Sequence, residues 1–346
     1  MSASNFFEDF RIGQVFHHAT PRTITAGDVA LCTALTGSRF AVNSSVEFAR
    51  RIGFKDAPID DLLVFNIVFG KSVADISQNA VANLGYAEGR FDAAVYPGDT
   101  LQATSSVIGL RETANRKTGV LWVRTTGRNQ RGETVVEYVR WVMVAKRDPG
   151  ARAPSPVVPQ LAAAVSPDAL AVPPELDLAR YDASLAGDPR RWGDFKPGER
   201  FDHVDGVTIE DAEHQLATRL YQNTARVHFD RHLAAKGRFA KRLVYGGHVI
   251  SLARALSFNG LANAFKIAAI NGGRHVAPVV AGDTLYAWSE VLDRHSIPGR
   301  ADVGALRLRT VAAKDHPCDD FPWKSGPDAD HPAIVLEFDY SVLVPC

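Results

Sequence analysis

The segment Tyr96-Pro97-Gly98-Asp99-Thr100-Leu101 recurs in the second half of the chain as Val280-Ala281-Gly282-Asp283-Thr284-Leu285. Asp9-Phe10-Arg11-Ile12-Gly13 recurs in the same way as Asp194-Phe195-Lys196-Pro197-Gly198. The two pairs give offsets of 184 (283 − 99) and 185 (194 − 9) residues. Solenoid repeats have periods of about 20–50 residues, so this much longer period predicts two fused copies of one domain.

We place the first copy at residues 1–147 and the second at 190–346, with an Ala- and Pro-rich segment, 148–189, between them. That segment lacks helical or strand periodicity, which indicates a semi-rigid linker that lets the two copies lie side by side. Because such a length without regular structure is unusual inside a compact protein, we expect the linker to lie along a surface.

Each copy combines one long apolar helix with several strands. The helix is expected at about 58–76 in the first copy and about 247–265 in the second, and alternating β-branched and aromatic residues follow it. The run Leu62 to Phe69 leaves almost no polar face, so its helix should be buried on most sides. A buried helix followed by antiparallel strands predicts an α+β hotdog domain, and the whole chain is then a double hotdog.

The bulk composition excludes several classes of protein. The 346 residues carry a formal net charge of zero, which gives no reason to expect nucleic acid as a partner. Cys32, Cys318 and Cys346 are spaced for neither a zinc site nor a disulfide framework, and no metal or redox cofactor motif is recognisable. No apolar run approaches the roughly 20 residues of a membrane span. We therefore expect a soluble, cytoplasmic protein with no membrane partner, and a homodimer of the double domain stays open.

The two copies differ where chemistry could occur. The 185-residue offset places Ser38 opposite Asn223, and Asn43 opposite His228. Histidine has an ordinary pKa of about 6.5, so it can serve as a general base near neutral pH. Only the second copy keeps this imidazole, which indicates one site per chain.

Two segments of the second copy resemble the signature of the MaoC-like R-specific enoyl-CoA hydratases. Gln222 to His228 corresponds to Gly-Asp-x-Asn-Pro-Ile-His, and Leu243 to Gly247 corresponds to Pro-Ile-Ala-His-Gly. Asn223 stands where that family has Asp, and Arg226 where it has Pro. Over essentially the whole chain, the sequence closely resembles the mesaconyl-CoA hydratases, a double-hotdog group of this family, most clearly in the segments 37–42, 58–65 and 245–250.

The resemblance implies reversible hydration of mesaconyl-CoA (2-methylfumaryl-CoA) to β-methylmalyl-CoA. This reaction needs a base to activate water, an acid to return a proton to C2, and donors that stabilise the enolate oxygen. His228 is the expected base, and Asn223 would orient the same water. An amide cannot exchange a proton, so the general acid stays open. Coenzyme A belongs to the substrate, and no other cofactor is implied.

The start of the central helix is expected to bind the thioester oxygen. Gly246 and Gly247 occupy that position in the second copy, where the backbone N–H groups of a helix lack partners. The first copy has Asp60 and Asp61 there, and these carboxylates would repel an enolate. The second carboxylate of the substrate needs a cation, for which we name Arg226 first and then His248, Arg39 and Arg274.

Two other functions stay open at this level. Hotdog folds also hydrolyse acyl-CoA, usually with an acidic residue near the central helix, so Asp60 and Asp61 could form the acidic pair of a thioesterase. The chain could also be a non-catalytic acyl-CoA binding protein whose catalytic residues have decayed. The fold alone does not choose between these functions.

Overall fold

The computed structural model describes residues 4–237 and 239–346. The first copy contains β1 (Val15–Thr23), α1 (Ala26–Thr36), α2 (Ala41–Ser44), α3 (Val46–Arg51), α4 (Asp61–Ser72), β2 (Ala80–Phe91), β3 (Thr100–Glu112), β4 (Thr118–Arg128) and β5 (Thr134–Ala145). The second copy contains β6 (Arg200–Asp202), β7 (Val207–Thr208), α6 (Asp211–Leu220), α7 (Arg231–Ala234), α8 (Gly246–Leu256), α9 (Phe258–Leu261), β8 (Lys266–His275), β9 (Thr284–Ile297), β10 (Arg300–Lys314) and β13 (Ile334–Pro345). A small hairpin, β11 (Lys324–Gly326) and β12 (Ala329–Asp330), is inserted before the last strand.

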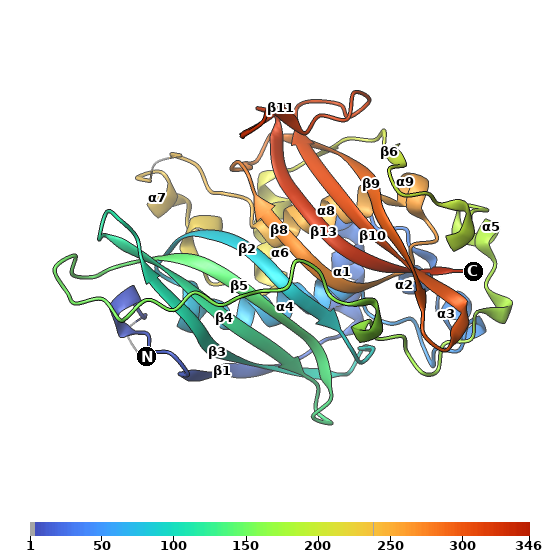
Figure 1. The fold of residues 1–346 in the computed structure, drawn as a ribbon, viewed down its shortest axis with the longest axis horizontal. Helices are drawn as coiled ribbons and strands as arrows, with labels where there is room; N and C mark the ends of the chain where they lie inside the picture. The colour runs from blue at the N-terminus through green and yellow to red at the C-terminus, as the bar shows by residue number, and fades with distance from the viewer. Residues whose placement is uncertain (1–3, 238) are drawn as a thin grey trace.

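The strands of both copies join into one sheet. Its order is β1-β3-β4-β5-β2-β8-β13-β10-β9-β6, and the antiparallel pair β2–β8 connects the copies at the centre. Helices α4 and α8 contact each other, and both pack against strands of their own copy behind the sheet in Figure 1. This arrangement confirms the predicted α+β double hotdog.

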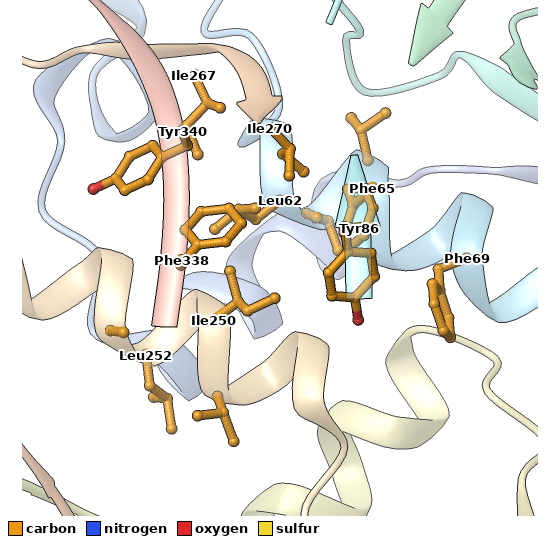
Figure 2. Packing of buried hydrophobic residues seen from close by; sticks show 14 of the residues in the cluster. Leu62, Phe65, Phe69, Tyr86, Ile250, Leu252, Ile267, Ile270, Phe338 and Tyr340 are labelled. Atoms are coloured by element: carbon orange, nitrogen blue, oxygen red, sulfur yellow. The ribbon is translucent and has the colours of Figure 1, made fainter. Parts of the chain in front are cut away.

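The two central helices meet at residues that correspond in the repeat. The side-chain Nδ2 of Asn66 on α4 donates to the Oγ of Ser251 on α8 at 3.1 Å, and the two positions differ by 185 residues (251 − 66). Every residue from Leu62 to Ser72 of α4 is buried, as its uniform apolar character predicts. Figure 2 shows Leu62 and Phe65 of α4 in the same core as Ile250 of α8.

Local sequence signals set the helix ends. Helix α1 begins after Thr25, whose side chain accepts from the N–H of Asp28, and it ends at Gly37 with φ +66°. The prediction of one helix at about 247–265 was wrong in its second half. Helix α8 ends at Leu256, and Asn259 (ψ 103°) and Gly260 (φ +97°) leave helical geometry within α9.

The segment between the copies lies along the sheet rather than apart from it. It contains short helical turns and one β-bridge between Val157 and Leu110, and the N–H of Ala162 donates to Oε1 of Glu88 at 2.9 Å. Three residues later, the N–H of Val165 donates to Oδ1 of Asn271 at 2.9 Å. Glu88 is on β2 and Asn271 on β8, so the segment crosses the strand pair that joins the copies, as its green trace in Figure 1 shows.

Gly70 of α4 gives a direct test of the contact between the copies. A Cβ at this position would collide with the backbone carbonyl oxygen of Tyr221, which precedes Asn223. Backbone cannot rotate away as a side chain can, so Gly70→Ala should destabilise the fold by about 1–3 kcal/mol. The measurement is the midpoint of thermal unfolding, with Gly193→Ala as control because a Cβ at Gly193 meets open space. Equal midpoints for the two variants would contradict the predicted contact.

Candidate active site

The start of α8 presents backbone donors that have no partner among the described residues. The N–H groups of His248 and Val249 bond to the carbonyl oxygen of Tyr245, the N-cap residue. Among the described residues, no acceptor pairs with the N–H of Gly246 or of Gly247. These two groups therefore match the predicted donors for a thioester oxygen.

Both glycines are also required by their neighbours. A Cβ on Gly246 would collide with the imidazole of His275, and a Cβ on Gly247 would collide with Oδ1 of Asn66. The first neighbour comes from β8 of the second copy and the second from α4 of the first copy, so both copies contact this helix terminus. The proposed binding of a thioester oxygen stays a prediction, because packing alone also explains the glycines.

His228 is held in the tautomer that a base requires. It ends a 3₁₀ turn, Arg226–His228, and its Nδ1 lies 2.9 Å from the carbonyl oxygen of Leu243. A carbonyl only accepts, so Nδ1 carries the proton and Nε2 keeps its lone pair. Burial lowers the pKa of His228 to about 4, so the ring is neutral at neutral pH. Its ring lies edge-on to that of Tyr245, with 5.6 Å between the centroids.

Asn223 shapes the turn that leads to His228. Its side chain is buried, and its Oδ1 accepts from the N–H of Ala225 at 2.9 Å. Its Nδ2 has no hydrogen-bond partner in the described parts of the chain, and the residue borders a groove of about 540 Å³ that Lys71 and Thr218 also line. The amide can therefore donate to a water, while its predicted role in orienting that water stays a prediction.

Sequence reasoning missed a second histidine and a tyrosine beside this terminus. The His275 ring covers Gly246, and its Nε2 lies 3.3 Å from the hydroxyl of Tyr86 on β2. Burial, and then the nearby His228, lower the pKa of His275 to about 4. The alternation of side chains along β8 could have indicated that His275 faces the helices. The sequence could not predict its contact with Tyr86, because that residue lies on β2 of the other copy.

Arg274 does not lie at this site, so we correct its prediction. Successive side chains on a strand point to opposite faces, and its neighbour His275 faces α8. Arg274 instead donates to Asp330 at 2.6 Å and to Glu337 at 2.8 Å. Hydrogen bonds to these two carboxylates outweigh burial and raise its pKa. A guanidinium already paired twice on the other face is not available to a substrate carboxylate.

Two other predicted carboxylate ligands also need correction. Arg39 is exposed, donates to Oδ1 of Asn259 at 2.6 Å and stacks on the ring of Phe258. His248 is buried within α8, and burial lowers its pKa to about 4, so it carries no positive charge at neutral pH. Arg226 is exposed at the start of the turn before His228, and its role stays a prediction.

The acidic pair of the first copy is occupied by structural contacts. Oδ1 of Asp60 accepts from the N–H groups of Leu62 and Leu63, which caps α4. Asp61 accepts from Nζ of Lys266 at 2.5 Å and from the N–H of Ile267 at 3.0 Å. Both carboxylates therefore have structural roles, Asp60 as the cap of α4 and Asp61 as the partner of Lys266.

Comparisons with known proteins identify the family of the chain. The family model described as mesaconyl-CoA hydratase matches residues 2–328. The chain belongs to the mesaconyl-CoA hydratase family. Within this family, it is 63% identical to a β-methylmalyl-CoA dehydratase of Chloroflexus aurantiacus, over 99% of this chain and 97% of the relative. It is 57% identical to a mesaconyl-CoA hydratase of Cereibacter sphaeroides, over 99% of both chains.

Solved structures show the same architecture for this mesaconyl-CoA hydratase family member. The crystal structure of a MaoC domain protein dehydratase from Chloroflexus aurantiacus has a TM-score of 0.98 and 62% identity, and covers 100% of this chain and 98% of its own. A double-hotdog protein of Mycobacterium tuberculosis has a TM-score of 0.78 at 25% identity, and covers 99% of both chains. In the described parts of the chain, no helix is long and apolar enough to cross a bilayer, and no three His, Cys, Asp or Glu side chains are grouped to hold a metal.

The role of Asp61 can be tested by removing its charge. Asp61→Asn leaves Lys266 as a buried, unpaired cation, which should lower the free energy of unfolding by about 3–5 kcal/mol. Hydration activity at the other half of the molecule should persist below the unfolding temperature. The measurement combines chemical denaturation with an activity assay, and Lys266→Met in the same chain should restore part of the stability. A loss of thioester hydrolysis in Asp61→Asn would instead support the thioesterase alternative.

Proposed function

We propose that this chain catalyses the reversible hydration of mesaconyl-CoA to β-methylmalyl-CoA, as a hydro-lyase, at the start of α8. The observation that carries the proposal is the position of His228, whose Nε2 is unprotonated and whose ring contacts Tyr245, the residue directly before Gly246 and Gly247 with their unpaired N–H groups. The activities after which two relatives at 63% and 57% identity are named support the same substrate.

The chemistry follows from these groups. Nε2 of His228 takes a proton from water as the oxygen attacks C3 of the conjugated double bond. Negative charge then develops on the thioester oxygen, and the N–H groups of Gly246 and Gly247 stabilise it. Asn223 holds the attacking water through Nδ2. The proton that returns to C2 comes from a histidine, since both His228 and His275 stand at this terminus.

Membership of the family implies an acyl-CoA thioester as substrate, and water is the second reactant. We propose that no cofactor takes part beyond the coenzyme A of the substrate. We also propose that the protein acts in the cytoplasm, which its cysteine usage supports, since Cys32, Cys318 and Cys346 are all free. A homodimer stays an open prediction.

Replacing His228 tests the proposed base. His228→Gln should lower kcat for mesaconyl-CoA by about 10²–10⁴-fold, the usual contribution of a general base. The assay follows the loss of absorbance of the conjugated thioester and, in the same cuvette, the release of free thiol. The matched control is Asn43→Ala, because Asn43 holds the equivalent position in the first copy and donates to the carbonyl oxygen of Pro58. Thiol release by the wild-type protein would point to a thioesterase. If neither the absorbance nor the free thiol changed, the result would point to a binding protein.

The pH dependence tests the state of His228. Its pKa is lowered to about 4, so the base form is fully present at neutral pH and is lost only as the pH falls towards that value. We expect kcat/KM to stay level down to about pH 5.5, whereas an ordinary histidine would lose half of its base form at about pH 6.5. Circular dichroism at each pH separates this titration from acid unfolding. An activity limb centred near pH 6.5 in folded protein would contradict the assignment.

A further inference from the structure

Arg140 is a buried cation with no anionic partner in the described parts of the chain. It lies on β5 with none of its surface exposed. Its Nη2 donates to the hydroxyls of Ser72 at 2.9 Å and Ser77 at 3.3 Å. Its Nε and Nη1 have no acceptor, and it forms no salt bridge with any carboxylate that the structure describes. A buried guanidinium in this condition is unfavourable unless something pairs with it.

The groups around Arg140 lead to the start of α8. Its guanidinium carbon stands 4.3 Å above the ring centre of Phe69, and the Phe69 ring lies 5.4 Å from that of Tyr245. Tyr245 caps α8 and also contacts the ring of His228, and its buried hydroxyl has no hydrogen-bond partner among the described residues. Tyr86 on β2 lies next to Phe69 in Figure 2, and it is directly opposite Arg140 on the neighbouring strand β5. Arg140, Tyr245 and His228 therefore belong to one connected cluster of side chains.

The repeat shows that this polar surface is specific to one half. In the register of the sheet, Arg140 lies opposite Tyr86 on β2 and Val123 on β4. The equivalent residue of the second copy is Tyr340, which lies opposite Ile270 on β8 and Leu308 on β10. The first copy thus presents Tyr86, Tyr138 and Arg140 behind the glycine-rich start of α8. At the equivalent places, the second copy presents Ile270, Phe338 and Tyr340, which Figure 2 shows in the apolar core.

The other half also holds a buried arginine, but there the protein supplies the carboxylate. Arg254 of α8 lines the same small cavity as Asp60. Burial raises the pKa of Asp60, and the charge of Arg254 acts against that rise. Asp60 stands at the position that Tyr245 takes in the second copy (245 − 60 = 185). The half with the glycines therefore has a buried guanidinium and lacks the internal carboxylate of its counterpart.

We propose that Arg140 binds the free carboxylate of the substrate, a role that rests on the proposed hydration of mesaconyl-CoA. The substrate class is the coenzyme A thioester of a short unsaturated dicarboxylic acid. Its thioester lies at the start of α8, and its other carboxylate accepts from the free N–H groups of Arg140 and from the hydroxyl of Tyr245. Arg140 is thus the residue that determines specificity.

Substrates without the carboxylate would leave Arg140 buried and unpaired. Sites built to pair with one polar group reject analogues that lack it by about 10⁴-fold. The matched probe is 2-methylcrotonyl-CoA, in which a methyl group replaces the free carboxylate of mesaconyl-CoA. A second probe is the methyl ester of that carboxylate, which is neutral and keeps its shape.

The experiment measures kcat/KM for the three thioesters in the wild type, Arg140→Met, Arg140→Lys and the control Arg254→Met. We expect Arg140→Met to lower kcat/KM for mesaconyl-CoA by about 10³-fold or more, with little change for 2-methylcrotonyl-CoA, so that the preference collapses. Arg140→Lys should recover part of the preference for mesaconyl-CoA. The folded fraction of Arg254→Met should keep the wild-type preference.

Each outcome bears on the proposal. An unchanged preference in Arg140→Met would overturn it while leaving the hydratase function intact. A wild type that hydrates neither dicarboxylic nor monocarboxylic thioesters would overturn the proposed function and this inference together. If Arg140→Met does not fold, the wild type decides the question with the ester alone, because turnover of the ester at the rate of the free acid would exclude a carboxylate-binding arginine.

Discussion

The contact between α4 and α8 is the constraint on which the site depends. Nδ2 of Asn66 donates to the carbonyl oxygen of Gly247 as well as to Ser251, so the first turn of α8 is held by the helix of the other copy. Gly70, one turn further along α4, lies directly against the backbone before Asn223. The donors of the site and the loop that carries its base are therefore both positioned by the first copy.

This dependence explains how one chain can carry one site although the fold is nearly symmetric. The start of each central helix has neighbours from both copies. A substitution in one copy therefore alters only one of the two helix starts, although these are equivalent in the repeat. Asp61 pairs with Lys266 and Asp60 caps α4, which closes one place with internal charges. The other has glycines at its helix start and keeps neutral histidines around it. Fusion of the two copies allows this division of roles, which identical subunits could not adopt.

The repeat and the hydrophobic patterns predicted the double hotdog and the register that singles out His228. They did not show which strand face meets which helix. Arg274 was chosen as a ligand for this reason, although its neighbour His275 is the residue that faces α8. Arg140 could have been noticed in the sequence, because it is a charged residue at an inward-facing position of its strand, between Tyr138 and Val142. What the sequence could not supply was the identity of its neighbours, since Tyr245 arrives from the second copy across the helix contact.

An uncompensated guanidinium has a cost in the ligand-free protein, and that cost has a consequence for selectivity. The folded state already contains the desolvated Arg140, so a dicarboxylic substrate relieves an existing penalty when it binds. A substrate without the carboxylate gains nothing there and also keeps the penalty. Discrimination of this kind comes mainly from what the wrong substrate leaves unpaired. The aromatic ring of Phe69 under the guanidinium reduces the penalty without cancelling the charge, because the face of a ring attracts a cation but cannot neutralise it. The site can therefore stay folded while empty and still require an anion for tight binding.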